Sequence, residues 1–187
     1  MHMNIKKLSG TTVYLDLVEE KDAEFICSLR NNPSLNNFLS KSTALPEIQR
    51  QWIRAYKTRE AENKEYYFII HRKDNDLPIG TIRLYDFLEH LKSFCWGSWI
   101  LNENKTPSAA IESALLIYRL GFEILGFEQS QFDVRKDNQK VSAFHVKLGA
   151  VKVAENDLDI FYVFPKAQYH SLKTKYQKFL ASPDSES

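Results

Sequence analysis

The first half of the chain alternates between patterns typical of strands and of helices. Residues 12–18 switch between apolar and polar positions with a period of two, as a half-buried strand does. An acidic run at 19–22 then opens a helical pattern, which Asn31-Asn32-Pro33 ends. A second predicted helix covers residues 46–60, with an apolar stripe made of Ile48, Trp52, Ile53 and Tyr56. Predicted strands forming a meander follow at residues 66–70, 78–85 and 93–101.

The second half alternates helices with strands. A long helix is predicted over residues 107–125, with an apolar stripe at steps of three and four made of Ile111, Leu115, Tyr118, Phe122 and Leu125. The elements predicted after it are a strand at 129–134, a helix at 138–148, strands at 151–154 and 160–164, and a helix at 169–181. Residues 182–187 form a polar tail. This order predicts an α/β (α+β) fold: one domain over residues 1–181, with a single mixed, mostly antiparallel sheet and helices on both faces.

The composition is that of a single soluble domain. The chain has 187 residues and a mass of 21.8 kDa, with 43% hydrophobic and 26% charged residues. Aromatic residues make up 13% against only six glycines, which indicates an aromatic-rich core or a pocket for a sizeable ligand. The 25 basic and 24 acidic side chains leave a net charge of +1. Nucleic acid, a polyanion, is therefore not an expected partner.

Targeting signals and cysteine spacing indicate the compartment. Residues 1–9 lack the apolar core of a signal peptide, and no apolar run approaches the roughly 18 residues that cross a bilayer. Cys27 and Cys95 lie far apart, as reduced thiols of a cytosolic protein do. We therefore expect a cytoplasmic monomer or homodimer with no membrane partner and no metal site.

The junction at residues 101–110 offers a candidate anion site. Thr106 can cap the following helix and Pro107 suits its first position, so the free N–H groups near Ser108, Ala109 and Ala110 point outward at the positive end of the helix dipole. Small residues let a phosphate approach this backbone, and Lys105 adds a positive charge. Many helices that begin this way bind nothing, so the segment alone leaves both interpretations open.

His145 is a candidate proton donor or acceptor. Val141, Phe144 and Leu148 form the apolar stripe of the helix at 138–148, and His145 lies one step round, at its edge. An imidazole in that place can exchange a proton near neutral pH. The structural alternative is a partly buried histidine that only packs.

Taken together, these segments carry a resemblance. The meander, the strand that enters a phosphate-facing helix, the run from Phe132 to Asn138 and the run Lys147-Leu148-Gly149-Ala150 resemble the Gcn5-related N-acetyltransferase (GNAT) superfamily over residues 10–165. The resemblance implies a sheet that splays between its fourth and fifth strands, where the co-substrate acetyl-CoA lies. The family's diphosphate loop, Gln/Arg-x-x-Gly-x-Gly/Ala, here has Lys105, Ser108 and Ala110 at its characteristic positions. Ser and Ala are the smallest residues after Gly.

The resemblance also assigns a role to His145. The family commonly places a Gly eleven positions after an Asn and a Tyr seven after it, and the Tyr acts as general acid towards the CoA thiolate. Asn138 and Gly149 keep that spacing, and His145 occupies the Tyr position. The resemblance thus implies that Asn138 belongs to the acetyl-CoA site. It also implies that His145 protonates the thiolate when charged, or relays a proton when neutral.

A narrower resemblance lies near the N-terminus. The run from Arg30 to Phe38, with Lys136-Asp137-Asn138 and Phe161-Tyr162-Val163, resembles the acetyltransferases that modify 4-amino-sugar nucleotides in pseudaminic acid synthesis. It implies that Arg30 and Asn31 wall the acceptor side, opposite the CoA cleft. The ribosomal-protein N-acetyltransferase-like branch also carries Arg-Asn-x-Pro. A helix end with a terminal cation is the structural alternative for Arg30 and Asn31.

The implied reaction is direct attack of an amine on the thioester. Trp99, Ile100 and Leu101 would hold the pantetheine arm through their backbone, and an N–H near Trp99 or Ile100 would stabilise the oxyanion. Relatives often carry a basic Glu where this chain has Trp96. The candidates left for the base are a water chain and three carboxylates: Asp86, Glu89 and Asp133.

Trp96 and Trp99 are three positions apart on one strand and are therefore expected on opposite faces of the sheet. One of them, with Phe38, is a candidate to stack on a uracil or sugar ring of the acceptor; core packing is the alternative. Asp86 is assigned to the same acceptor side.

Three functions remain open at this stage. The first is acetyl transfer to a small-molecule amine, a UDP- or dTDP-linked amino sugar being preferred. The second is acetylation of a protein N-terminus or another small amine. The third is acyl-CoA binding without catalysis, suggested by the missing glycines and the missing Glu.

Overall fold

The structure, a computed structural model, describes residues 5, 7–35 and 45–180 of the chain. Its strands form one sheet in the order β1-β2-β3-β4-β5-β6-β8-β7. They are β1 (Leu8–Ser9), β2 (Val13–Leu17), β3 (Tyr66–Arg72), β4 (Pro78–Leu88), β5 (Ser93–Leu101), β6 (Gln129–Arg135), β7 (Val151–Glu155) and β8 (Asp159–Pro165). The β5–β6 pair is parallel and the other neighbours are antiparallel. The predicted mixed sheet is confirmed.

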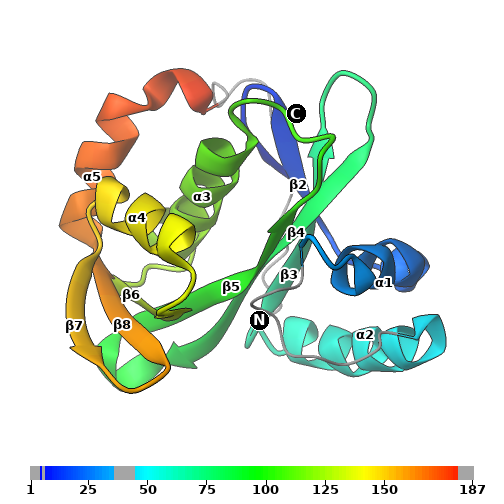
Figure 1. Ribbon diagram of the computed structural model, residues 1–187, viewed down its shortest axis with the longest axis horizontal. Helices are drawn as coiled ribbons and strands as arrows, with labels where there is room; N and C mark the ends of the chain where they lie inside the picture. Colours follow the sequence, from blue (N-terminus) through cyan, green and yellow to red (C-terminus); the bar gives the residue numbers. More distant parts are fainter. Residues whose placement is uncertain (1–4, 6, 36–44, 181–187) are drawn as a thin grey trace.

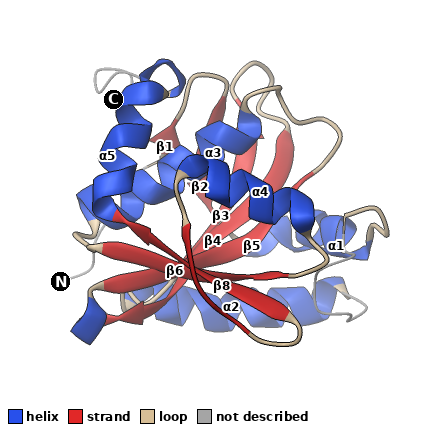
Figure 2. Ribbon diagram, turned by 60° about the vertical axis from the view of Figure 1, so that its left-hand side comes forward, coloured by secondary structure: helices blue, strands red, loops and turns tan. Residues whose placement is uncertain are grey.

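Helices cover both faces of the sheet, as predicted. The helices are α1 (Ala23–Asn31), α2 (Pro46–Ala61), α3 (Ala109–Arg119), α4 (Gln139–Leu148) and α5 (Lys166–Lys175). Figure 1 shows α1 and α2 together on one side of the strands and α3, α4 and α5 on the other. Figure 2 shows α4 in front of the sheet and α2 behind it.

Each face of the sheet carries its own core. Side chains alternate along β3, so Phe68 and Ile70 join the large core beneath α3, while Tyr67 and Ile69 join a smaller core beneath α1 and α2. The buried face of α2 includes Gln49, Ile53, Tyr56 and Glu60. The predicted stripe was wrong at Ile48, which is 58% exposed.

The start of α3 differs from the prediction. Ser108, not Thr106, is its N-cap residue, and the helix begins at Ala109. The Thr106 side chain instead points to a partner distant in sequence, with its hydroxyl 2.7 Å from the Thr12 hydroxyl. At its other end α3 continues into a π-helical turn at Leu120–Ile124.

Other boundaries also differ. The last helix begins at Lys166, directly after Pro165, and ends at Lys175, so the range 169–181 was wrong at both ends. Short 3-10 turns at Glu20–Asp22, Glu89–Leu91 and Gln177–Phe179 and the two-residue strand β1 were not predicted. Such elements are too short for a periodic pattern.

The feature that positions the site is a separation of β5 from β6. These strands pair only at Ser93 with Gln129 and at Phe94 with Ser130. Farther along, towards Leu101, β5 stays paired with β4 while β6 stays paired with β8. The sheet therefore divides into two parts at this point, as the family resemblance implied.

A bulge in β5 lies at the start of this separation. Thr81 pairs with Ile100 and Arg83 with Gly97, so two steps on β4 face three on β5. Ser98 takes the extra place with φ of 47°. The bulge shifts the alternation by one residue, and it brings the Trp96 and Trp99 rings to 5.3 Å on one face. The prediction that they lie on opposite faces was wrong.

Candidate active site

A cavity of about 430 Å³ fills the space between β5 and β6. Its walls come from both strands and from the start of α4. The described residues that line it are Ser34, Leu35, Trp96, Gly97, Ser98, Trp99, Ile100, Leu101, Lys105, Phe132, Asp133, Val134, Arg135, Asn138, Lys140, Val141 and His145. Most residues predicted for the acetyl-CoA site thus meet here.

The predicted diphosphate loop lies next to this cavity. Lys105 lines it, whereas Ser108, Ala109 and Ala110 form the adjacent start of α3. Ser108 has φ of −99° and ψ of −2°. Because this conformation is open to any residue, glycine is not required at that position.

A buried carboxylate holds the loop in place. Glu112 Oε1 accepts hydrogen bonds from the Ser108 hydroxyl at 2.5 Å and the Thr12 hydroxyl at 2.8 Å. Its Oε2 accepts from the backbone N–H of Thr12 at 2.8 Å and of Val13 at 3.1 Å. The serine in the glycine position therefore turns inward to Glu112. This arrangement ties the start of α3 to β2.

The cavity has a basic rim that the sequence reading missed in part. Arg135 ends β6 and Lys140 lies in the first turn of α4, and with Lys105 they line the opening. Three cations suit the phosphate groups of a nucleotide such as CoA. The sequence did hold a signal for this rim: Arg135 and Lys140 lie on either side of Asn138, where a strand gives way to a helix.

Asn138 and Gly149 bound α4, which gives their spacing a structural meaning. The Asn138 side chain accepts a hydrogen bond from the N–H of Val141 at 3.3 Å and caps the helix. Gly149 ends it in the left-handed conformation, with φ of 111°. The motif thus fixes the length and place of the helix that carries His145.

His145 is more deeply placed than its predicted position at the edge of the stripe. It is 5% exposed, with its ring centroid 4.2 Å from that of Phe132 and 5.1 Å from that of Trp96. Burial lowers its pKa to about 4, so the ring is neutral at pH 7. Of the two implied modes, donation by a charged imidazolium therefore does not fit neutral pH.

Two side chains lock the bulge of β5. The Thr81 hydroxyl, buried between the strands, donates a hydrogen bond to the Ser98 carbonyl at 2.7 Å. The Trp99 indole N–H donates to the Ser113 hydroxyl on α3 at 3.1 Å. The backbone that would meet the thioester is thus held from β4 and from α3.

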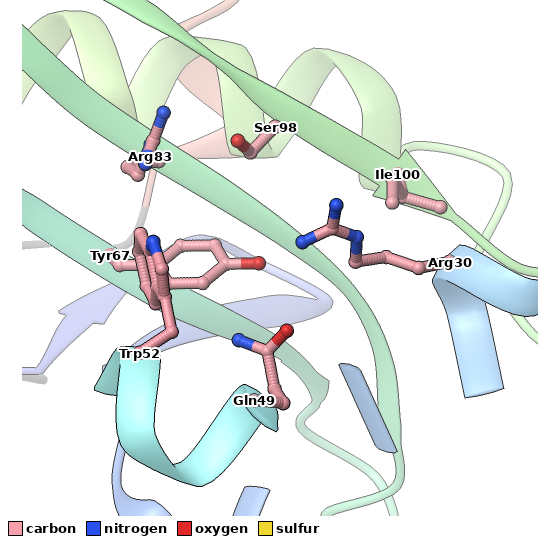
Figure 3. Close-up of a pocket in the computed structure, with 7 residues that line it drawn as sticks. All are labelled: Arg30, Gln49, Trp52, Tyr67, Arg83, Ser98 and Ile100. Carbon is pink, nitrogen blue, oxygen red and sulfur yellow. The ribbon is translucent and has the colours of Figure 1, made fainter. Parts of the chain in front are cut away.

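A second cavity, of about 170 Å³, lies on the α1–α2 face of the sheet. Figure 3 shows its lining side chains converging from α1, α2 and three strands: Arg30, Gln49, Trp52, Tyr67, Arg83, Ser98 and Ile100. Ser98 and Ile100 also line the first cavity. The bulged strand therefore borders both cavities.

This second cavity combines cations with aromatic rings. The Arg83 guanidinium lies 4.2 Å from the Tyr85 ring centroid and 5.6 Å from that of Trp52. The Arg83 guanidinium also donates a hydrogen bond to the Glu65 carboxylate at 3.1 Å. Burial raises the pKa of the Tyr67 hydroxyl, which therefore stays protonated at neutral pH. Such a lining suits an anionic ligand with a flat ring. Of the residues that line this cavity, the sequence analysis assigned only Arg30 to the acceptor. Gln49, Trp52, Tyr67 and Arg83 lie on separate elements and share no motif, so the sequence analysis did not find them.

A third cavity, of about 290 Å³, lies between β4 and the β6–β8 part of the sheet. Asp86, Cys95 and Asp133 line it, with Phe132 shared with the first cavity. Burial raises the pKa of the Cys95 thiol to about 11. Cys95 is therefore a protonated thiol at neutral pH rather than a nucleophile.

The predicted acceptor residues are only partly brought together. Arg30 lines the second cavity and Asp86 the third, while Asn31 is the exposed last residue of α1. Trp96 packs on the α3–α4 side, where its ring centroid lies 5.5 Å from that of Tyr118. Phe38 and the tail at 182–187 lie outside the described residues.

The described residues offer neither a cluster of metal ligands nor a membrane-spanning helix. Within residues 5, 7–35 and 45–180, no three His, Cys, Asp or Glu side chains gather as metal ligands. None of the helices in that part of the chain combines the length and the apolar character needed to span a bilayer.

Comparison with protein families decides the class. The model of the acetyltransferase (GNAT) domain matches residues 12–151. The chain belongs to the GNAT acetyltransferase family. This confirms the resemblance stated above and makes the chain an acyl-CoA-dependent N-acetyltransferase with acetyl-CoA as co-substrate. A search of the curated proteins gives no match.

Solved structures add a specific neighbour to this GNAT enzyme. Apo FdhC, described as a nucleotide-linked sugar GNAT, is 58% identical with a TM-score of 0.89, over 95% of this chain and 100% of that one. Ribosomal-protein-S5-alanine acetyltransferase from Vibrio fischeri is 16% identical with a TM-score of 0.76, over 88% and 99% of the two chains. Spermidine N-acetyltransferase from Vibrio cholerae, solved with CoA and spermine, is 17% identical with a TM-score of 0.70, over 85% and 98%. The last two share the fold.

Proposed function

We propose that this GNAT enzyme transfers the acetyl group of acetyl-CoA directly to the amino group of a nucleotide-linked sugar. The observation that carries the proposal is the 58% identity to a nucleotide-linked sugar GNAT along nearly the whole of both chains. The narrower resemblance of the Arg30 segment agrees with it. A 4-amino group on the sugar is the preferred position, as that segment implies.

The two cavities beside the bulge support this assignment. The β5–β6 cavity, with its basic rim, takes acetyl-CoA, and its thioester lies beside the bulged backbone near Ser98. The cavity on the α1–α2 face takes part of the acceptor, with Arg30 and Arg83 near its phosphates and Trp52 beside a ring. Because Ser98 and Ile100 line both cavities, the amine reaches the thioester where the two cavities adjoin at the bulge.

The reaction needs no covalent enzyme intermediate. A neutral amine attacks the thioester carbonyl, a backbone N–H near Trp99 or Ile100 stabilises the oxyanion, and the C–S bond breaks as the intermediate collapses. The CoA thiolate takes its proton through His145, whose neutral ring donates an N–H or orders a water that does so. His145 lies on the acetyl-CoA side of the strand, as this role requires.

A substrate panel tests the proposal. Purified enzyme is incubated with acetyl-CoA and UDP- or dTDP-linked amino sugars, with peptides and polyamines as parallel acceptors, and release of free CoA thiol is followed. We expect thiol release and an acetylated product with a sugar nucleotide and little with the other amines. Matched 3-amino and 4-amino sugars establish the position.

Binding measurements separate the alternatives. Acetyl-CoA at saturating concentration is expected to raise the melting temperature, because it binds only the folded state. Turnover on a peptide or polyamine alone would replace the proposed acceptor. Stabilisation without turnover on any amine would instead support a non-catalytic acyl-CoA-binding protein.

We keep the cytoplasm as the proposed location. Both cysteines are free and buried, as in proteins of reducing compartments. A monomer or homodimer stays a prediction, which sedimentation of the purified enzyme would test.

A further inference from the structure

Asp133 lies on β6, between the β5–β6 cavity and the third cavity. It belongs to β6, one residue after Phe132, which packs against His145 on the α3–α4 side. Side chains alternate along a strand, so Asp133 points to the other face. Asp133 lies three residues beyond Ser130, the last residue of β6 that pairs with β5, and so falls in the part of β6 that has separated from β5.

Asp133 lines two cavities at once. It is the one carboxylate among the described residues that line the β5–β6 cavity, and it also lines the third cavity on the opposite face. To attack the thioester, the acceptor amine has to enter the β5–β6 cavity, and Asp133 is the carboxylate present there.

The other carboxylates considered for the base are placed less well. Asp86 lines the third cavity alone. Glu89 lies exposed in the 3-10 turn after β4 and lines none of the three cavities. The position where relatives often carry a Glu is the buried Trp96 on the α3–α4 side.

The surroundings of Asp133 favour proton uptake. The titratable and charged groups around it are Tyr85 and Asp86 from β4, Cys95 from β5, Arg135 from β6 and Asp159 from β8. Arg135 is paired with Asp159 at 3.5 Å. Partial burial, and then the like charge of Asp159, raise the pKa of Asp133. A raised carboxylate pKa suits a base that works near neutral pH.

We propose that Asp133 is the general base of this enzyme: it removes a proton from the acceptor ammonium as the amine enters the β5–β6 cavity beside the thioester. The proposal rests on the proposed function, because it requires an amine acceptor. It assigns the catalytic role that Trp96 cannot fill.

The proton balance is complete. The Asp133 carboxylate takes one proton from the ammonium and becomes a carboxylic acid, and the neutral amine then forms the N–C bond at the thioester carbonyl. As the intermediate collapses, the C–S bond breaks with its electron pair on sulfur, and the second proton of the nitrogen reaches the thiolate by way of His145 or a water. Asp133 finally releases its proton to solvent. The products are the amide, CoA thiol and one proton.

The test compares Asp133→Asn with Asp86→Asn, which removes a carboxylate that lines the third cavity alone. At pH 7 we expect Asp133→Asn to lower kcat by about 100-fold or more, within the usual range for a general base. The deficit should shrink as the pH approaches the pKa of the free amine, because deprotonated acceptor then no longer needs the base. Asp133→Glu should recover part of the rate. Acetyl-CoA affinity, measured by thermal shift, should stay unchanged in all three.

The outcomes distinguish this proposal from the proposed function. Wild-type turnover with an Asp133→Asn variant of equal kcat and unchanged pH profile overturns the role of Asp133 alone. A higher KM for the acceptor at unchanged kcat also overturns it, since that indicates attraction of the ammonium. If the wild type prefers another amine, the same variants are compared on that amine. A chain that binds acetyl-CoA but acetylates no amine overturns both proposals.

Discussion

His145 illustrates how burial changes the chemistry that a residue type allows. Its sequence position matches a general acid, yet the ring lies among Phe132, Trp96 and Trp99. Within the described residues, its Nδ1 has no hydrogen-bond partner. With a pKa of about 4, the ring offers a neutral N–H at pH 7, which is still able to relay a proton to sulfur.

His145→Phe and His145→Gln test that role in turnover. We expect both variants to lower kcat, by about 100-fold for a full general-acid contribution, with little change in acetyl-CoA affinity. The Gln variant should keep more activity than Phe, because its amide can still hold a water. Steady-state kinetics and thermal shift with acetyl-CoA measure the two effects. Unchanged kcat in the Phe variant would reduce His145 to packing.

The same residue predicts an acid-sensitive fold. Its pKa falls from an ordinary value near 6.5 to about 4 on folding, so below about pH 6.5 the unfolded state binds the proton more readily. The stabilisation is complete above that pH and is lost as the pH falls towards 4, by at most about 3 kcal/mol. Urea unfolding at several pH values should show this slope, and His145→Phe should flatten it. An equal slope in both proteins would contradict the prediction.

The bulge in β5 determines which side chains face which cavity. It brings Trp96 and Trp99 to one face and turns the backbone around Ser98. Its main side-chain support is the bond from Thr81 to the Ser98 carbonyl. A single buried hydroxyl on β4 therefore supports the strand that borders both cavities.

Thr81→Val removes that hydroxyl at nearly constant volume. It should lower the free energy of unfolding by about 1–3 kcal/mol, because the Ser98 carbonyl loses its partner. It should also raise the KM for acetyl-CoA by loosening the bulge. Thr81→Ser, which keeps the hydroxyl, is the matched control and should stay near wild type. Equal behaviour of the two variants in denaturation and kinetics would show that the hydroxyl is dispensable.

Glu112 holds the diphosphate loop in place by hydrogen bonds, as Thr81 holds the bulge. Glu112→Gln should lower the free energy of unfolding by about 2 kcal/mol, because a neutral amide replaces the charged acceptor of four hydrogen bonds. The KM for acetyl-CoA should rise more than kcat falls. Gly10→Ala should also disturb this carboxylate, since the added Cβ would lie 2.5 Å from Glu112 Oε2.

Ser108→Ala removes one of the hydrogen bonds to Glu112 and should destabilise the fold less than Glu112→Gln. A Ser108→Ala variant that is as destabilised as Glu112→Gln would refute this ranking.

These elements show where sequence reasoning succeeds and where it stops. The strands and helices follow from periodicity, and α4 is bounded by Asn138 and Gly149 as its end signals predict. The N-cap of α3 and the bulge were missed, because each depends on a partner far along the chain: Thr12 for Thr106, and Thr81 for Ser98. Local patterns carry no information about such partners.

At the scale of the whole molecule, the acetyl-CoA side was more predictable than the acceptor side. The residues of the β5–β6 cavity come largely from two strands and the start of α4, and motifs describe much of this part of the chain. The cavity on the α1–α2 face takes Gln49, Trp52, Tyr67 and Arg83 from three separate elements. Only the packing of α2 across β3 and β4 brings them together.

The proposed direct transfer requires both substrates to be bound together, one in each of the two cavities that share Ser98 and Ile100. Initial-rate plots with varied acetyl-CoA and acceptor should therefore intersect, whereas an acyl-enzyme route would give the parallel lines of ping-pong kinetics. A Cys27→Ala/Cys95→Ala variant should keep turnover within a small factor, since burial raises the pKa of both thiols and neither is a competent nucleophile at pH 7. Mass spectrometry after incubation with acetyl-CoA alone should find no acetylated cysteine. Parallel lines together with an acetylated Cys95 would require a different chemistry and a different use of the third cavity.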